Sequence, residues 1–198
     1  MQDETSAKDL RERLGLIENM IAEGRQRTES WGWSFVLWGV AYYVAIAWSV
    51  WGHAALAWPV TMVAASVLTG ILASRVSTKG AETTLGRAMA AIWIAMGMSL
   101  FIVLICLSMS GRADLHVFVA IVGGALGTAN ATSSMILKWK MQFACAVVWF
   151  ATAAVSCFIS ETQASIVFLI TIFFCQIVFG IYGMIGEARR RKQDAAHA

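Results

Sequence analysis

Four side chains of types that commonly bind metal ions lie in the short polar segments predicted on one side of the bundle: His53, Asp114, His116 and Glu161. Two imidazoles and two carboxylates would suit a borderline cation such as zinc. They come from three separate short polar segments, and they show no tight ligand spacing. Because polar residues are common in exposed turns, we expect these four to be solvated turn residues, with no bound metal and no cofactor.

A second polar feature is the segment GGALGTANATSS, which runs from Gly123 to Ser134 inside an otherwise apolar stretch. Gly123 and Gly127 form a GxxxG pattern, and small residues at this spacing let helix backbones approach closely. The pattern predicts a packing helix at the centre of a helix bundle or at a dimer interface. The alternative is that Thr128 and Asn130 line a polar path or a ligand pocket.

The sequence carries no catalytic signature. It has no phosphate-binding glycine loop, no HExxH and no GxSxG. No ionisable residue lies in the middle of the long apolar stretches, where such residues normally mark proton relays, ion paths or voltage sensors. Because the basic residues are dispersed over several polar segments, nucleic-acid binding is not expected either. We therefore predict that the chain is not an enzyme.

The N-terminal segment carries a candidate partner-binding surface. Residues 6–29 are predicted to form a helix with one apolar stripe, spaced by four, three and four residues: Leu10, Leu14, Ile17 and Ile21. The first 30 residues hold five basic and seven acidic side chains, whereas helices that lie on anionic bilayers are usually strongly basic. We expect the stripe to pack on the chain's own loops, on a second copy as a short coiled coil, or on a cytoplasmic protein partner.

Composition and hydropathy indicate the elements that position these residues. The chain is 59% hydrophobic and 14% charged, against about 45–50% and about 25% in ordinary soluble domains. Uncharged apolar runs of about 20 residues have the length of a helix that crosses a hydrocarbon layer of about 30 Å. The sequence therefore predicts an all-α, polytopic membrane protein: a cytoplasmic amphipathic helix over 1–30, a six-transmembrane-helix bundle over 31–186 and a basic cytoplasmic tail over 187–198. The expected spans are 31–52, 54–74, 88–110, 115–137, 141–160 and 163–185.

The distribution of basic residues predicts the orientation of these spans. Fourteen of the 15 Lys and Arg residues lie in segment 1–30, in the second and fourth joints between spans, or in the tail, and the three alternate joints hold only Arg112. Because Lys and Arg accumulate in cytoplasmic loops, we expect both termini in the cytoplasm. The expected partners are the lipid bilayer and either a second copy or a cytoplasmic protein.

The stretch IENMIAEGRQRTESWGWSFVLWGVAYYVAIAW, from Ile17 to Trp48, pairs an NMI…R helix with a first span that contains FxLWG, here Phe35, Leu37, Trp38 and Gly39. In this it resembles a loosely related group of small bacterial membrane proteins that have one helix before six spans. The resemblance implies the bacterial inner membrane. It also implies a cytoplasmic protein partner, since some members of the group are encoded beside winged-helix transcriptional regulators.

These features lead to two hypotheses about function. The first is a non-enzymatic membrane protein with a sensing, scaffolding or regulatory role through its cytoplasmic helix. The second is a small transporter or permease subunit, because the exporter permeases that work with a separate ATPase resemble this plan of an amphipathic helix before six spans. The sequence departs from those permeases in lacking the broken helices expected between the last two spans.

Overall fold

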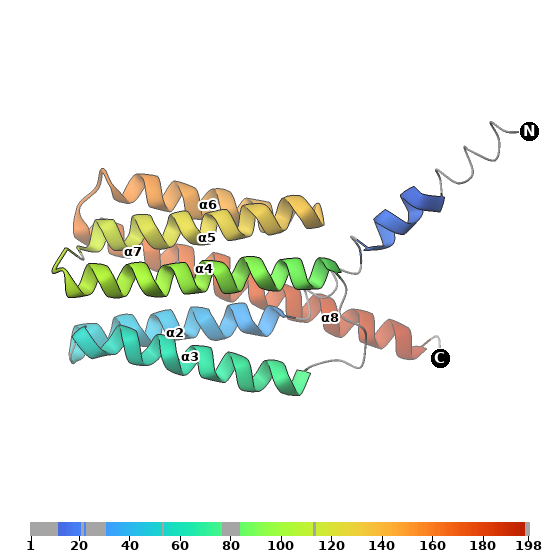
Figure 1. Ribbon diagram of the computed structural model, residues 1–198, viewed down its shortest axis with the longest axis horizontal. Coiled ribbons are helices and arrows are strands. Elements are labelled where there is room, and N and C mark those ends of the chain that lie inside the picture. The colour runs from blue at the N-terminus through green and yellow to red at the C-terminus, as the bar shows by residue number, and fades with distance from the viewer. Residues whose placement is uncertain are drawn as a thin grey trace, which may run out of the picture.

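Figure 1 shows the computed structural model, an all-α bundle whose helices run roughly along its longest axis. The structure describes residues 12–20, 22, 31–52, 54–76, 84–112 and 114–196. A helical segment at 12–20 precedes the bundle. The bundle then consists of α2 Gly32–Trp51, α3 Ala54–Val76, α4 Thr84–Met109, α5 Leu115–Leu137, α6 Lys140–Ser156, α7 Glu161–Ile172, the π-helical η1 Phe173–Val178 and α8 Phe179–Ala196.

Five helical segments in the described part of the chain are long and apolar enough to cross a membrane. They are Gly32–Trp51, Leu56–Arg75, Leu85–Met109, Leu115–Leu137 and Glu161–Arg190, whereas the apolar helix Lys140–Ser156 is shorter. The all-α class predicted from the sequence is confirmed, and the long apolar helices are consistent with a membrane protein. The helix expected over 141–160 ends at Ser156, because residues 157–160 form the turn before α7.

Local side-chain signals explain where α5 and α7 begin and where α5 ends. The Asp114 carboxylate accepts a hydrogen bond from the Val117 backbone N–H at 2.8 Å and so caps α5. Lys138 adopts a left-handed conformation, with φ 49°, that terminates the same helix. Ser160 and Gln163 form a reciprocal capping box at the start of α7. The predicted span 115–137 therefore has the bounds of α5.

The last helical run is longer than the span predicted over 163–185. It begins at Glu161, passes through η1 and continues as α8 to Ala196, so the residues predicted as a basic tail are helical over 187–196. The Tyr43 hydroxyl of α2 donates a hydrogen bond to the Leu169 carbonyl oxygen at 2.8 Å, just before η1. A π-helical turn inside an α-helix often accompanies a functional site.

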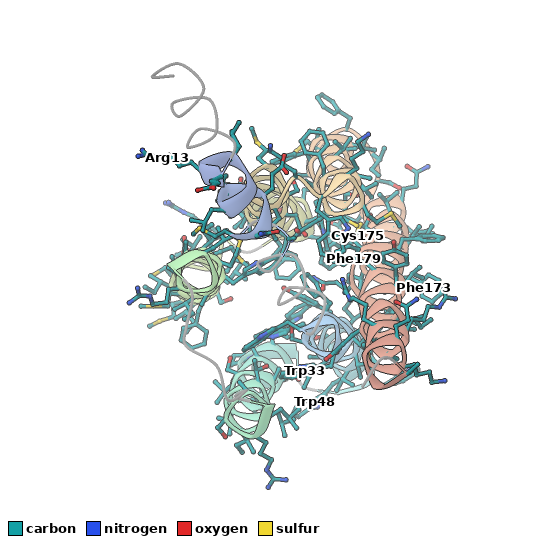
Figure 2. The ribbon with its side chains drawn as sticks, turned by 90° about the vertical axis from the view of Figure 1, so that its right-hand side faces the viewer. Arg13, Trp33, Trp48, Phe173, Cys175 and Phe179 are labelled. Atoms are coloured by element: carbon teal, nitrogen blue, oxygen red, sulfur yellow. The ribbon has the colours of Figure 1, made fainter. Side chains whose placement is uncertain are left out.

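The helices differ in how deeply they are packed. In the most apolar 18-residue stretch of each helix, the share of buried residues is 39% for α5 and 44% for the last helical run. The same share is 17% for α3 and 6% for α4. In the end-on view of Figure 2, α3 and α4 lie at the periphery. The interior is therefore built mainly by α2, α5, α6 and the α7–η1–α8 run.

Candidate functional site

α2 and α8 cross at a pair of glycines. A Cβ added to Gly180 would lie 2.7 Å from the Gly32 carbonyl oxygen, and a Cβ added to Gly32 would lie 2.6 Å from the Gly180 carbonyl oxygen. Further along α2, a Cβ on Gly39 would lie 3.0 Å from the Gln176 Cβ. The backbones approach this closely because no side chain stands between them. The crossing holds Gln176 of η1 against α2.

α5 and α6 pack through the two glycines of the predicted GxxxG pattern. A Cβ on Gly123 would lie 3.0 Å from the Ala153 Cβ, and a Cβ on Gly127 would lie 2.7 Å from ring carbons of Phe150. The two helices are joined by a tight turn in which the Trp139 N–H donates to the Ser134 carbonyl oxygen at 2.9 Å. These contacts fix an antiparallel register between α5 and α6.

Two clusters of aromatic side chains lie in the interior, one toward each end of the bundle. We call the two ends the Ser160 end and the Lys138 end, after the turns that lie there. In the cluster toward the Ser160 end, ring centroids lie 4.6 to 6.3 Å apart; its members are Tyr42, Trp58, Phe118, Trp149 and Phe168. In the cluster toward the Lys138 end they lie 5.1 to 5.3 Å apart; its members are Phe35, Trp93, Trp139 and Phe179. Tilted and edge-to-face rings at such distances attract one another.

Buried, uncharged polar side chains lie between the two clusters. We call them the polar layer: Asn130 and Ser133 of α5, Gln142 of α6 and Gln176 of η1, each at most 3% exposed. Along α6, Gln142 stands between the cluster members Trp139 and Trp149. Along the last helical run, Gln176 likewise stands between Phe168 and Phe179.

Two contacts between α6 and the last helical run place Gln142 and Gln176 at the same level of the bundle. The Cys175 thiol lies 3.8 Å from the Cys145 carbonyl oxygen, on one side of both glutamines. The Trp139 and Phe179 rings lie 5.1 Å apart on the other side. Figure 2 shows Cys175 and Phe179 pointing into the bundle, whereas Phe173 points away from it.

The polar layer has hydrogen-bonding atoms without partners in the described part of the chain. The Asn130 Nδ2 donates to the Leu126 carbonyl oxygen at 2.9 Å, but its Oδ1 accepts no hydrogen bond. Four further buried atoms have no hydrogen-bond partner in the described part of the chain: the Ser133 Oγ, the Gln142 Oε1 and Nε2, and the Gln176 Oε1. An unpaired buried polar group costs about 1–3 kcal/mol. The polar layer therefore offers unused donors and acceptors in the interior.

The chemistry open to the polar layer is neutral hydrogen bonding. Amides and a hydroxyl do not titrate near neutral pH, so the layer holds no general acid or base. On the Ser160 side of the layer, the hydroxyls of Thr152 and Thr171 bond to each other at 2.6 Å. That pair is satisfied within the protein, which distinguishes it from the layer.

Thr128, which the sequence grouped with Asn130, faces a different neighbour. Its hydroxyl donates to the Gly124 carbonyl oxygen at 2.8 Å. It lines a groove of about 290 Å³ between α4 and α5, whose walls include Ser99 and Thr132. The structure therefore separates the predicted set: Gly123 and Gly127 face α6, Asn130 lies in the core, and Thr128 lies toward α4.

The candidate metal ligands act as caps and turn contacts. Asp114 caps α5, and its Oδ1 lies 4.0 Å from the His116 Nδ1. The His116 Nε2 lies 3.0 Å from the Ile159 carbonyl oxygen and donates to it. Glu161 is an exposed residue of the first turn of α7, and His53 lies outside the described residues. Among the described residues, no group of three His, Cys, Asp or Glu side chains could hold a metal ion.

The described part of the N-terminal helix exposes its apolar stripe. Leu14 is 54% exposed and Ile17 is 52% exposed. Leu10 and Ile21, the other two members of the predicted stripe, lie outside the described residues. Leu16 and Met20 of the same segment are exposed as well. The helix at 12–20 thus presents apolar side chains on more than the predicted face.

No family model, curated protein or solved structure matches this chain. The likeness of residues 17–48 to a group of small bacterial membrane proteins stays an expectation.

The sequence carries a signal for the polar layer on the buried face of α6. Gln142 and Ser133 were not singled out, because neither belongs to a charged cluster or a known motif. On α6, however, the buried residues recur at helical spacing and are mostly small or polar: Gln142, Cys145, Ala146, Trp149, Thr152 and Ser156. In a helix surrounded by lipid, such a face indicates the side that meets other helices.

Proposed function

We propose that this chain is a non-enzymatic, multi-pass protein of the bacterial inner membrane with a sensing, scaffolding or regulatory role. The observation that carries the proposal is the exposed apolar surface of Leu14 and Ile17 on the N-terminal helix. A short isolated helix is marginal in water and gains stability mainly by packing an apolar face on another surface. The proposed occupant of that face is a cytoplasmic protein.

The proposed topology has six spans with both termini in the cytoplasm. The 17 residues of Lys140–Ser156 correspond to about 26 Å of helix, at the short end of the range that crosses a bilayer. An even number of crossings returns the chain to its starting side. It thereby keeps fourteen of the 15 basic residues on that side, as the preference of Lys and Arg for the cytoplasm requires.

The proposal is tested by changing the stripe in the full-length chain. Leu14→Asp combined with Ile17→Asp places two charges on the exposed apolar face without touching the bundle. Chemical cross-linking in cells, followed by purification and mass spectrometry, should recover a cytoplasmic protein with the parent chain. We expect that protein to be lost from the double variant.

Matched changes on the same helix provide the control. Glu12→Gln with Glu18→Gln alters two polar positions and should leave the cross-linked partner in place. A cross-linked product made of two copies of the chain would replace the partner assignment with self-association. An identical set of products from the parent, the stripe variant and the control would exclude the N-terminal helix as the contact.

A second candidate function, a permease subunit of an ATPase-driven exporter, is favoured by the polar layer inside the bundle. The substrate sites of many transporters lie inside the helix bundle, between transmembrane helices. The genes beside this one distinguish the two proposals. A neighbouring ATPase gene supports transport, and a neighbouring gene for a DNA-binding regulator supports the regulatory role.

A further inference from the structure

Two of the four cysteines of this chain lie against each other inside the bundle. Cys145 of α6 is 7% exposed and Cys175 of η1 is 2% exposed. The Cys175 Sγ lies 3.8 Å from the Cys145 carbonyl oxygen, and the two thiols are within hydrogen-bonding reach of each other. Both are free thiols in this structure. We propose that Cys145 and Cys175 are a redox-sensitive pair, which an apolar oxidant of the lipid phase converts into a disulfide between α6 and η1.

Contacts on both sides of the pair hold α6 against the last helical run. Toward one end of the bundle, the Trp139 and Phe179 rings lie 5.1 Å apart. Toward the other end, the hydroxyls of Thr152 and Thr171 bond to each other at 2.6 Å. The two thiols therefore meet because the register of these helices brings them together. A disulfide requires this arrangement, because it forms only between cysteines whose Cβ atoms lie close and face each other.

Cys175 lies in the π-helical segment Phe173–Val178. Such turns are rare inside α-helices and often accompany functional sites. In Figure 2, Cys175 points into the bundle, whereas Phe173 of the same turn points away from it. A bond between the two sulfurs would join positions that are 30 residues apart in the chain. The oxidised protein would therefore hold η1 on α6 by a covalent link that the reduced protein lacks.

The burial of the pair determines the class of oxidant. Buried thiols are shielded from charged reagents in water. Cys145 nevertheless borders the outer face of α6, because its helical neighbours Met141 and Val148 are 45% and 42% exposed. In the proposed membrane location this face meets lipid, so the oxidant is an apolar two-electron acceptor of the quinone class. This choice rests on the proposed membrane location and is independent of the partner proposed for the N-terminal helix.

The reaction is a two-electron oxidation of the two thiols. Two S–H bonds break and one S–S bond forms. The two electrons and the two protons pass to the quinone, whose two carbonyl oxygens become the hydroxyl groups of a hydroquinone. No further reactant is needed.

Duroquinone is the probe for the test, because its ring has no free position at which a thiol could stay attached. Cys106→Ser and Cys157→Ser remove the two exposed cysteines from the full-length protein, which is then reconstituted into phosphatidylcholine vesicles. After exposure to duroquinone, the protein is denatured and its remaining thiols are labelled with N-ethylmaleimide. We expect the labels per chain to fall from two to none, to return to two after reduction, and a linked Cys145–Cys175 peptide in mass spectra. Oxidised glutathione, which is charged, should leave both thiols free.

A relocated thiol provides the matched control. Phe173→Cys combined with Cys175→Ser keeps one cysteine in α6 and one in η1. The relocated thiol lies at a position that is 46% exposed and points away from the bundle in Figure 2. We expect no linked peptide and two labels per chain in this variant. Equal linking in the variant and in the double-serine protein would overturn the proposal, because the link would then not depend on the contact between Cys145 and Cys175.

The remaining outcomes separate the redox pair from the membrane location. Two labels per chain in the double-serine protein after duroquinone would overturn the proposal. Oxidation by glutathione disulfide as fast as by duroquinone would overturn the assignment of an apolar oxidant. Flotation of the vesicles is measured on the same sample. Protein that does not float with the lipid would contradict the membrane location, and the lipid-phase oxidant with it, whereas floating protein with both thiols unlinked would contradict the redox pair alone.

Discussion

At the scale of single residues, the glycines of this chain differ in how much space a Cβ atom would find around them. A Cβ on Gly180 would press on the backbone of α2, 2.7 Å from the Gly32 carbonyl oxygen and 3.0 Å from the Val36 nitrogen. A Cβ on Gly97 of α4 would meet nothing within 4 Å. In both helices alanine has the higher helix propensity, by about 0.8–1.0 kcal/mol. The packing around each glycine therefore decides whether its substitution by alanine stabilises or destabilises the protein.

Gly180→Ala is expected to lower the free energy of unfolding by about 1–3 kcal/mol, as for other overpacked sites. The neighbours that must move are backbone atoms, which cannot rotate away. Gly97→Ala is the matched control, and it should leave stability unchanged or raise it by up to about 1 kcal/mol. The measurement is unfolding in a mixed-micelle denaturant titration. Equal effects of the two substitutions would contradict the close crossing of α2 and α8.

The Tyr43 hydroxyl makes a second contact at the scale of single residues, because it ties α2 to α7 shortly before η1 begins. It donates to the Leu169 carbonyl oxygen at 2.8 Å. Tyr43→Phe should lower the free energy of unfolding by about 0.5–1.5 kcal/mol, the usual net value of one hydrogen bond. Tyr182→Phe, at an exposed position of α8, should have no measurable effect. If both variants unfold like the parent, the bond contributes nothing to the link between α2 and α7.

At the scale of elements, the α5–α6 hairpin depends on one left-handed residue. Lys138 has φ 49° and is the only non-glycine residue of the described chain with a positive φ. A left-handed conformation costs a residue with a Cβ about 1–2 kcal/mol, and glycine escapes this cost. The bonds from the Lys138 and Trp139 N–H groups to the Ser134 carbonyl oxygen hold the turn in place.

Lys138→Gly is therefore expected to stabilise the protein by about 1 kcal/mol. Lys140→Gly removes the same charge from the same joint, but it places glycine in the first turn of α6, where it should be neutral or destabilising. Comparing thermal midpoints of the two variants separates backbone conformation from charge. A lower midpoint for Lys138→Gly than for Lys140→Gly would disprove the role assigned to this turn.

At the scale of the whole molecule, the short helix α6 decides the topology. If it crosses the membrane, the turns at Lys138 and Ser160 lie on opposite sides. Alkaline phosphatase fused after Lys138 should then be inactive and green fluorescent protein at the same place should fluoresce, with the reverse result after Ser160. Fusions after Gly111 and after the C-terminus provide references for the two sides. The same response after Lys138 and after Ser160 would show that α6 does not cross.

The sequence by itself determined the helices and their most regular boundaries. Apolar length, the Asp114 cap and the turn after Leu137 are local properties, which is why the predicted span 115–137 has the bounds of α5. The predicted orientation of the spans likewise needs only the number of Lys and Arg residues in each segment between them. The continuation of α8 through the basic segment was not foreseen, because the predicted span ended where the charged residues begin.

Only the tertiary structure decided which polar residues are buried in the interior. Asn130 and Thr128 are two positions apart and were grouped together, yet one lies in the core and the other lines the groove toward α4. Gln142 belongs to the polar layer, although it lies in no sequence motif. The physical reason is that the direction of a side chain relative to other helices depends on their register. That register is fixed by close contacts between distant glycines and their neighbours, such as Gly32 with Gly180, which local pattern does not encode.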